Sequence, residues 1–299
     1  MNDFLSVADL SPDGLNEVLD RSAAVKKDPA AVAGALDGTS VGLFFQKPSA
    51  RTRISTEVGA AQLGMTPIVL KADEIGLGKR EAVSDVGRVF DRYLDALAFR
   101  VFSHDDLVTI AENAKAPVLN LLSDLEHPCQ ALADLQTVAE TRPLPETVLA
   151  FVGDGNNVAH SLMLAGAMTG MEIRIATPPG YEPLPDVLEA ANAYEGSVSV
   201  TNDVSEAIAG AHVVYTDVWA SMGQEAEAEE RLKSFMAYQV DGDKFATAAD
   251  GAIFLHCLPA HRGEEATDEV LDHARSRIFD QAENRLHSFK ALLLHTFGK

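Results

Sequence analysis

The chain has 299 residues, of which 46% are hydrophobic, and its formal net charge is −21. This length suits a large buried core and predicts about two domains. The negative charge argues against binding nucleic acid or an anionic membrane surface, since both repel an acidic protein. We also expect no membrane segment and no signal peptide, because the apolar runs are short and the first residues are not basic.

The two cysteines, Cys129 and Cys257, lie far apart and form no paired spacing. This pattern favours a reduced, cytoplasmic protein over one held by disulfides, and either thiol could have a function. The acidity, as in Glu225, Glu227 and Glu229, would suit a salty cytoplasm, although ordinary solubility explains it more simply.

The first half of the chain alternates apolar strands with amphipathic helices. A helix capped by Ser11 leads, and another begins near Ala50. Strands are expected at residues 41–45, 67–70, 96–99 and 117–120, with further helices at 83–93 and 104–114. This alternation predicts right-handed crossovers and a parallel sheet covered on both faces.

A second series of the same kind follows Pro143-Leu144-Pro145, which we interpret as a hinge. Its strands are expected at residues 148–152, 172–176, 197–201, 213–216 and 252–255. The fold class is therefore α/β, with two doubly wound domains, each a parallel sheet flanked by helices, joined by crossing helices. We place the domains at 1–140 and 141–281, and expect the helix of 282–299 to pack back on the first.

Polar clusters follow many of these strands, at the edge where parallel sheets bind ligands. The recurrence predicts one cleft between the domains. The clusters lie at residues 49–53, 100, 127–130, 153–157, 217–223 and 256–259.

The cluster at 49–53 reads Ser-Ala-Arg-Thr-Arg and follows a strand and a proline turn. Ser49 is a good N-cap, so unpaired backbone N–H groups should face outward there and attract an anion. Arg51 and Arg53 add guanidinium groups that match phosphate oxygens. A phosphate cradle and a capped surface helix with solvated arginines are both open at this point.

Three further polar residues have two interpretations each. Arg100 follows an apolar run and needs an anion, which is either a ligand or a structural ion-pair partner. His127 and Gln130 precede a helix expected from about Ala131. They either contact a ligand or simply cap the helix. No second histidine or carboxylate stands at metal-ligand spacing from His127, so we expect no zinc there.

The later clusters are weaker signals. Residues 153–157, Gly-Asp-Gly-Asn-Asn, suggest a dinucleotide turn, but Val158 and Ala159 stand where the third glycine belongs, so we predict a tight turn presenting the asparagines. Residues 217–223 offer a carboxylate and a hydroxyl that suit an ammonium group. Cys257 is either a contact for an amine or electrophile or an inert buried thiol.

Taken together, the motifs resemble the aspartate/ornithine carbamoyltransferase family, and within it the branch that acts on ornithine. Each motif is modest alone, and their order along nearly the whole chain is specific. The motifs that carry the resemblance are Asp3-Phe4-Leu5-Ser6, His127-Pro128-Cys129-Gln130-Ala131-Leu132-Ala133-Asp134, Gly153-Asp154-Gly155-Asn156-Asn157, Ser221-Met222-Gly223, His256-Cys257-Leu258-Pro259-Ala260 and Glu283-Asn284-Arg285-Leu286-His287.

The resemblance implies transfer of the carbamoyl group of carbamoyl phosphate to the side-chain amine of L-ornithine, without a metal or an organic cofactor. It also implies a carbamoyl phosphate domain followed by an ornithine domain, and a homotrimer or a multiple of trimers. The implied carbamoyl phosphate contacts are Ser49, Ala50, Arg51, Thr52, Arg100, His127, Gln130, Cys257, Leu258 and Arg285. The implied ornithine contacts are Asn157, Asp217, Ser221 and Met222, and the implied catalytic residues are Cys257, Arg100, His127 and Asp217.

The chain departs from the family pattern at several positions. Ala50 stands where threonine is usual, Gly76 where relatives often carry a glutamine, and Gln46 replaces an acidic residue. These losses keep open a binding paralogue with a weakened phosphate site, beside a carbamoyltransferase for another amine. A nicotinamide oxidoreductase is a third class, and the incomplete glycine pattern argues against it.

Overall fold

The computed structural model describes residues 3–220 and 227–299. The chain divides into two compact units, Met1–Gln136 with Glu283–Lys299, and Thr137–Ala282. We call them unit 1 and unit 2 and describe each by itself. Within the described ranges, no helix combines the length and apolar character needed to cross a membrane.

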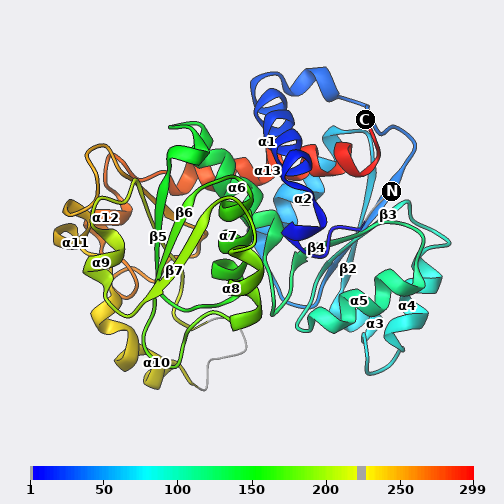
Figure 1. Ribbon diagram of the computed structural model, residues 1–299. Helices are drawn as coiled ribbons and strands as arrows, with labels where there is room; N and C mark the ends of the chain where they lie inside the picture. Colours follow the sequence, from blue (N-terminus) through cyan, green and yellow to red (C-terminus); the bar gives the residue numbers. More distant parts are fainter. Residues whose placement is uncertain (1–2, 221–226) are drawn as a thin grey trace. The chain divides into compact units, whose positions relative to one another are not determined.

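Unit 1 is built on a four-stranded parallel sheet in the order β2-β1-β3-β4. Helices α1, α2 and α13 lie on one side of this sheet, and α3, α4 and α5 lie on the other (Figure 1). Its strands are β1 (Ser40–Phe45), β2 (Thr66–Lys71), β3 (Ala96–Arg100) and β4 (Val118–Leu122). Its helices are α1 (Pro12–Lys27), α2 (Ala50–Gln62), α3 (Ala72–Ile75), α4 (Val83–Phe90) and α5 (His104–Asn113), while α6 (Pro128–Ala139) and α13 (Ile278–Thr296) have residues in both units.

Unit 2 is built on a five-stranded parallel sheet in the order β7-β6-β5-β8-β9. Helices α7 and α8 cover one face, and α9, α11 and α12 cover the other (Figure 1). Its strands are β5 (Val148–Val152), β6 (Glu172–Ala176), β7 (Ser197–Thr201), β8 (Val213–Thr216) and β9 (Ile253–His256). Its own helices are α7 (Asn157–Met168), α8 (Pro185–Ala191), α9 (Val204–Ile208), α10 (Ala228–Phe235), α11 (Gly242–Ala246) and α12 (Asp268–Leu271).

The prediction of parallel sheets flanked by helices is confirmed. Ser11 caps α1 as predicted, because its side-chain oxygen accepts from the Gly14 N–H at 3.0 Å. Several boundaries differ from those expected. Arg100 is the last residue of β3, because it pairs with Phe45 across the sheet, rather than following the strand. Helix α6 begins at Pro128, earlier than expected, since proline fits a first helical turn. Helix α13 begins at Ile278, before the expected start at residue 282.

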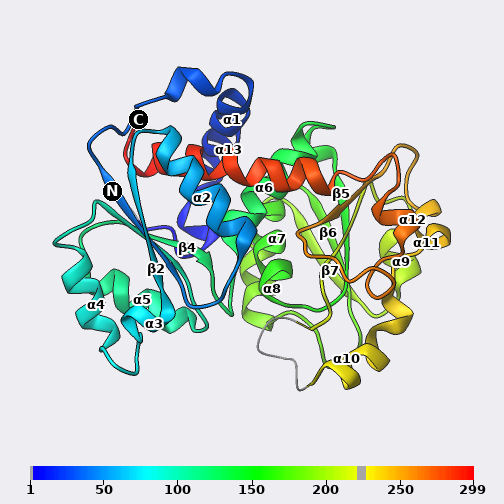
Figure 2. The same ribbon diagram turned by 180° about the vertical axis from the view of Figure 1, so that it is seen from behind.

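The C-terminal helix packs closely on α2 in unit 1. Figure 2 shows α13 passing across α2. A Cβ atom added at Gly59 would lie 3.4 Å from side-chain carbons of Leu286 and Lys290. These are ordinary van der Waals distances, so α2 and α13 are in direct contact at Gly59.

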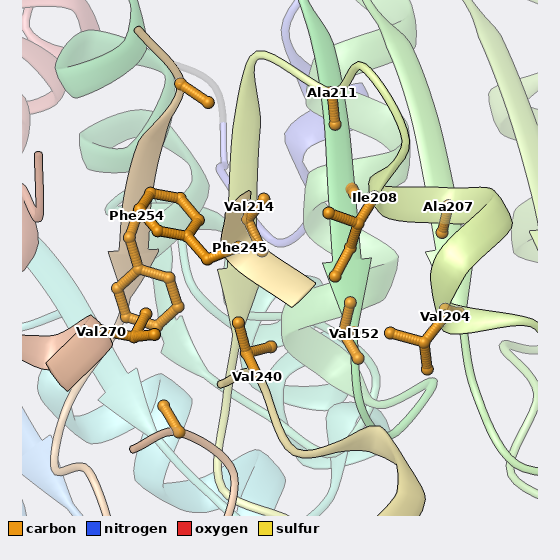
Figure 3. Close-up of a cluster of buried hydrophobic side chains, with 14 of the residues drawn as sticks. Val152, Val204, Ala207, Ile208, Ala211, Val214, Val240, Phe245, Phe254 and Val270 are labelled. Carbon is orange, nitrogen blue, oxygen red and sulfur yellow. The ribbon is translucent and has the colours of Figure 1, made fainter. Parts of the chain in front are cut away.

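The core of unit 2 joins the sheet to the helices α9, α11 and α12. Phe254 on β9 and Phe245 on α11 have ring centroids 6.1 Å apart, and Val214 and Val240 pack in the same cluster (Figure 3). Phe245 is 3% exposed and also meets the His273 ring edge-on. This packing supports the strand that carries the residues discussed below.

We expect Phe245→Ala to destabilise unit 2 by about 3–5 kcal/mol, because it removes a buried ring and leaves a cavity. Phe279→Ala is the matched control, since that ring is 70% exposed, and it should change stability by less than about 0.5 kcal/mol. Urea unfolding followed by fluorescence reports unit 2 directly, because the only tryptophan of the chain is Trp219. Equal midpoints for the two variants would contradict this account of the core.

Candidate functional site

The first turn of α2 offers a site for an anion. Ser49 caps the helix: its Oγ accepts from the Thr52 N–H at 3.3 Å and donates to Thr52 Oγ1 at 3.1 Å. Arg51 lies half-buried in this turn, whereas Arg53 forms an exposed pair with Glu57 at 3.4 Å. The two arginines predicted to bind phosphate therefore have different surroundings. Arg53 is engaged by a surface ion pair, and Arg51 is the one whose position suits a ligand.

Arg100 ends β3 beside the end of β1 and is 7% exposed. Its carbonyl accepts from the Gln46 N–H at 2.8 Å, and the Gln46 side chain accepts from the Phe102 N–H at 2.9 Å. The loops that follow β1 and β3 are thereby tied together. The glutamine that replaces an acidic residue has a structural role here.

His127 is a buried, neutral imidazole at the start of α6. Its pKa lies well below the ordinary value because burial disfavours the charged ring, and because Arg285 and Arg100 repel a proton. It is 5% exposed. Near neutral pH the ring therefore carries one N–H donor and one acceptor.

Arg285 joins α13 to this cluster. One of its terminal nitrogens donates to Gln130 Oε1 at 2.6 Å, and the other donates to Thr52 Oγ1 at 3.0 Å. The structure thus brings together four predicted residues, Ser49, Thr52, Gln130 and Arg285, and both Arg285 and Arg100 act on His127. The predicted Ala50 lies exposed in the same turn of α2.

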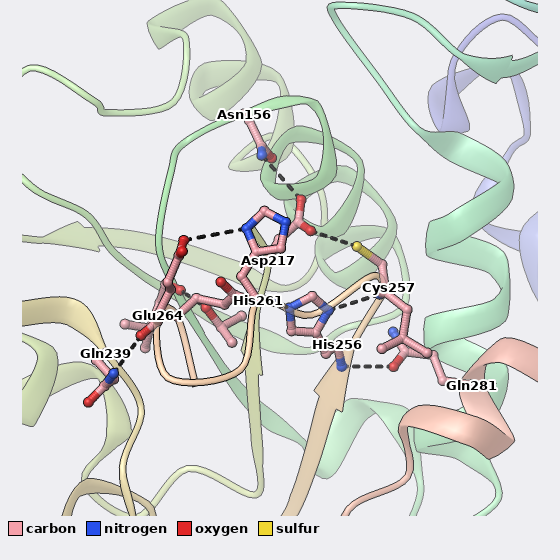
Figure 4. A network of polar contacts seen from close by, with 12 residues as sticks. Asn156, Asp217, Gln239, His256, Cys257, His261, Glu264 and Gln281 are labelled. Atoms are coloured by element: carbon pink, nitrogen blue, oxygen red, sulfur yellow. Dashed lines mark hydrogen bonds and ion pairs between the residues drawn. The ribbon is translucent and has the colours of Figure 1, made fainter. Parts of the chain in front are cut away.

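Unit 2 presents a buried carboxylate, Asp217, directly after β8. The Cys257 thiol donates to Asp217 Oδ1 at 2.9 Å, and the Asn156 amide donates to Asp217 Oδ2 at 3.3 Å (Figure 4). Strands β5, β8 and β9 are neighbours in the sheet, so their ends bring these three residues together. The predicted ornithine contacts Ser221 and Met222 lie outside the described residues.

The Gly-Asp-Gly-Asn-Asn turn after β5 differs from its prediction. Asn156 is not presented to a ligand, because its oxygen caps α7 by accepting from the Val158 and Ala159 N–H groups. Asn157 is the first residue of that helix. A Cβ at Gly155 would lie 2.3 Å from the Pro183 nitrogen, so this glycine permits close packing of two chain segments.

A buried pair that the sequence did not reveal supports Leu258. His256 and Glu265 are both 0% exposed, and His256 Nε2 lies 3.0 Å from Glu265 Oε1. The other ring nitrogen accepts from the Leu258 N–H at 2.8 Å, and Leu258 has φ 58°. The pair thus fixes the backbone beside Cys257. His256 was part of a noted motif, but nothing in the sequence marked Glu265 as its partner.

A second overlooked pair supports the chain after Asp217. Arg231 donates to Asp154 Oδ2 at 2.8 Å and to the Trp219 carbonyl at 3.0 Å. Burial raises the pKa of Asp154 to about 6, against the opposing charge of Arg231 and with a contribution from Asp217. Their separation by 77 positions left no sequence signal.

Two groups of side chains in the described part of the chain hold possible metal-ligand atoms. Asp217, His256 and Cys257 form one, and His261, Glu264 and Glu265 form the other, each with ligand atoms within 4.8 Å of one another. Both ring nitrogens of His256 already have partners, as does the Cys257 thiol. A metal in the first group would have to break these contacts.

The two thiols have different surroundings. Cys129 is buried and donates to the Asn120 carbonyl at 3.3 Å, and burial raises its pKa to about 12. Cys257 is half-buried and contacts a carboxylate. Of the two candidate thiols, Cys257 therefore suits a functional role.

Known proteins resemble this chain along nearly its whole length. Residues 2–140 match the family described as aspartate/ornithine carbamoyltransferase, carbamoyl-P binding domain, and residues 146–296 match its Asp/Orn binding domain. An ornithine carbamoyltransferase from Symbiobacterium thermophilum is 49% identical, covering 97% of this chain and 96% of the relative. A catabolic ornithine carbamoyltransferase from Halobacterium salinarum is 47% identical, covering 99% of each chain. The solved ornithine carbamoyltransferase from Pyrococcus furiosus superposes with a TM-score of 0.95 at 45% identity, covering 99% of this chain and 97% of that one.

We expect a thiol-reactive aromatic disulfide to modify one thiol per native chain and two per unfolded chain, since both cysteines are free and only Cys257 is accessible. Cys257→Ser should abolish the native reaction, whereas Cys129→Ser should preserve it. Absorbance of the released thiolate measures both. Rapid native labelling of Cys257→Ser would contradict the burial of Cys129.

Proposed function

The chain belongs to the aspartate/ornithine carbamoyltransferase family, and on this premise we propose that it makes L-citrulline and phosphate from L-ornithine and carbamoyl phosphate. The observation that carries the proposal is the cluster of Thr52, Arg100, His127 and Arg285, which gathers donors for an anion at the start of α2. Each unit is proposed to hold one substrate: carbamoyl phosphate in unit 1 and ornithine in unit 2.

In the proposed transfer, the ornithine amine attacks the carbamoyl carbon, a C–N bond forms, and the C–O bond to phosphate breaks. The electron pair of that bond leaves with phosphate, and a phosphate oxygen takes up the proton that the attacking nitrogen loses. A free amine of this type has a pKa of about 10.4, so it must lose a proton before it attacks. The protein's task is therefore to orient the amine, neutralise the phosphate and stabilise the developing oxyanion.

The residues of unit 1 suit the anionic substrate. Arg51, Arg285 and the first N–H groups of α2 would hold the phosphate, because guanidinium groups and helix N-termini both favour phosphate oxygens. Thr52, Arg100 and neutral His127 would donate to the carbamoyl oxygen as negative charge develops there. Neutral His127 binds the substrate without needing to gain a proton.

The residues of unit 2 suit the amine. Asp217 would accept hydrogen bonds from the ornithine side-chain amine, since Asn156 and Cys257 use only part of its acceptor capacity. The carbonyl of Leu258, held by His256, would accept from the NH₂ of the carbamoyl group. We assign the remaining ornithine contacts to Asn157, Ser221 and Met222.

We extend the proposal to a cytoplasmic homotrimer, or a multiple of trimers, that acts in arginine biosynthesis. The family membership supports the assembly, and the two free thiols fit a reducing compartment. One relative is named catabolic, and the same contacts serve the reverse reaction. The direction in the cell therefore depends on substrate supply rather than on these residues.

An assay of carbamoylated product, with ornithine, putrescine, acetylornithine and aspartate offered in turn, tests the activity. We expect turnover with ornithine and at least about 100-fold lower kcat/KM with the others, since each lacks or alters a group that the site must pair. Preference for another amine would reassign the substrate. Binding of carbamoyl phosphate without turnover of any amine would favour the binding paralogue instead.

We expect Ala50→Thr to lower the KM for carbamoyl phosphate by up to about tenfold, because it adds a hydroxyl donor to the first turn of α2. Ala50 is exposed, so the larger side chain has room. Initial-rate kinetics at saturating ornithine measure the effect, with Ala50→Val as the control of the same shape. Equal KM values for the threonine and valine variants would show that the backbone N–H suffices.

A further inference from the structure

Asp134 is a fully buried carboxylate on α6, 0% exposed, to which the proposed mechanism gives no role. It lies one helical turn after Gln130, and Gln130 Nε2 donates to Asp134 Oδ1 at 2.8 Å. Gln130 in turn contacts Arg285. Asp134 is therefore one residue removed from the phosphate-binding cluster.

The chemistry of a carboxylate fixes which way the Gln130 amide points. A carboxylate only accepts hydrogen bonds, so the amide must turn its NH₂ group toward Asp134. The amide oxygen is then directed to Arg285, whose guanidinium only donates. Without Asp134 the amide could rotate by half a turn and place its NH₂ against the guanidinium, donor against donor.

The same constraint continues to Thr52. Its Oγ1 accepts from the Arg285 guanidinium at 3.0 Å and from the Ser49 hydroxyl at 3.1 Å. A hydroxyl has two acceptor lone pairs and one hydrogen, so both lone pairs are used and the hydrogen is left to donate. The oxygens of a phosphate or a carbamoyl group are acceptors, and Thr52 is then a committed donor to them.

We propose that Asp134 is a positioning residue for carbamoyl phosphate, which sets the direction of the hydrogen bonds from Gln130 through Arg285 to Thr52. This inference rests on the proposed function, because it deepens the role of the unit 1 site. It predicts that the binding of the anion depends on the hydrogen-bond polarity at position 134 rather than on its size or burial.

Asp134→Asn tests polarity at constant shape. An asparagine can donate or accept, so Gln130 loses its fixed orientation, and the dissociation constant for carbamoyl phosphate should rise by about tenfold or more. Titration calorimetry with carbamoyl phosphate, and with inorganic phosphate as a second probe, measures binding without turnover. Ser22→Ala is the matched control, since it removes a buried hydrogen bond from Ser22 to Gln136 on the same helix, and it should leave binding unchanged.

The double variant Asp134→Asn/Gln130→Glu exchanges donor and acceptor at unchanged net charge. The asparagine amide at position 134 would donate to the new carboxylate at position 130, whose other oxygen would accept from Arg285, so the orientation of Arg285 is restored. We expect the double variant to bind the probes more tightly than Asp134→Asn, and to regain the folded state if the single variant does not fold. Thr52→Val should be introduced both into the native chain and into Asp134→Asn. The loss of affinity that it causes should be smaller in Asp134→Asn than in the native chain.

The outcomes separate this inference from the proposed function. Failure of the native chain to bind either probe would reject the function itself. Native binding with an equal dissociation constant for Asp134→Asn would reject the positioning role alone. A folded double variant no better than the single variant would reject it as well, because polarity would then not decide binding.

Discussion

The Arg285 guanidinium connects the C-terminal helix to the proposed phosphate site of unit 1, and the rest of that cluster depends on it. It holds Gln130 and Thr52 at once and helps to keep His127 neutral. A planar group with several fixed donors can do this, whereas a lysine offers a single point charge. The residue lies 155 positions after Gln130, so the cluster forms only when α13 packs against the first domain.

The attraction of an anion to arginines such as Arg285 must outweigh its repulsion by a chain whose net charge is −21. At about 4 Å and an effective dielectric constant of about 20, one ion pair contributes roughly 4 kcal/mol. Surface carboxylates beyond about 8 Å are largely screened in physiological salt. The contacts at the proposed site therefore outweigh the distant charges, so the acidity of the chain does not argue against an acyl phosphate as substrate. The surface acidity influences solubility far more than substrate affinity.

The fold class was predictable because short strands alternate with amphipathic helices along the whole chain. Strands β5, β6, β7 and β8 have the expected bounds, although β6 and β7 alternate polar and apolar residues. Boundaries failed where pairing or proline chemistry extends an element beyond its apolar core, as at Arg100 in β3 and Pro128 in α6. The periodicity of apolar residues does not reveal strand pairing or the preference of proline for a first helical turn.

The location of candidate residues was predictable where a motif follows a strand, as at Ser49, Asp217 and Cys257, and their roles stay predictions. It was not predictable where a residue acts through a distant partner. Glu265 supports His256, and Arg231 supports Asp154, through contacts that follow from the folded chain and leave no local pattern. The prediction for Asn156 was wrong for a related reason. Its side chain was expected to face a ligand, but it caps α7 and contacts Asp217 instead. The expected cleft between the domains stays a prediction.

Hydrogen-bond donors dominate the cluster around Arg285 in unit 1, and acceptors dominate the cluster around Asp217 in unit 2. The positions where the chain departs from its family pattern can be judged against the unit 1 cluster. Ala50 removes a hydroxyl from the donor-rich cluster but leaves the helix N–H groups and the arginines in place. Gly76 has φ 68° and ends α3, and a Cβ there would lie 2.8 Å from the Arg80 side chain. A larger residue at position 76 would strain this turn, so the backbone, rather than a lost function, explains the glycine. Neither departure removes a hydrogen bond of the proposed phosphate site, because the bonds that join Ser49, Thr52, Gln130 and Arg285 involve neither position.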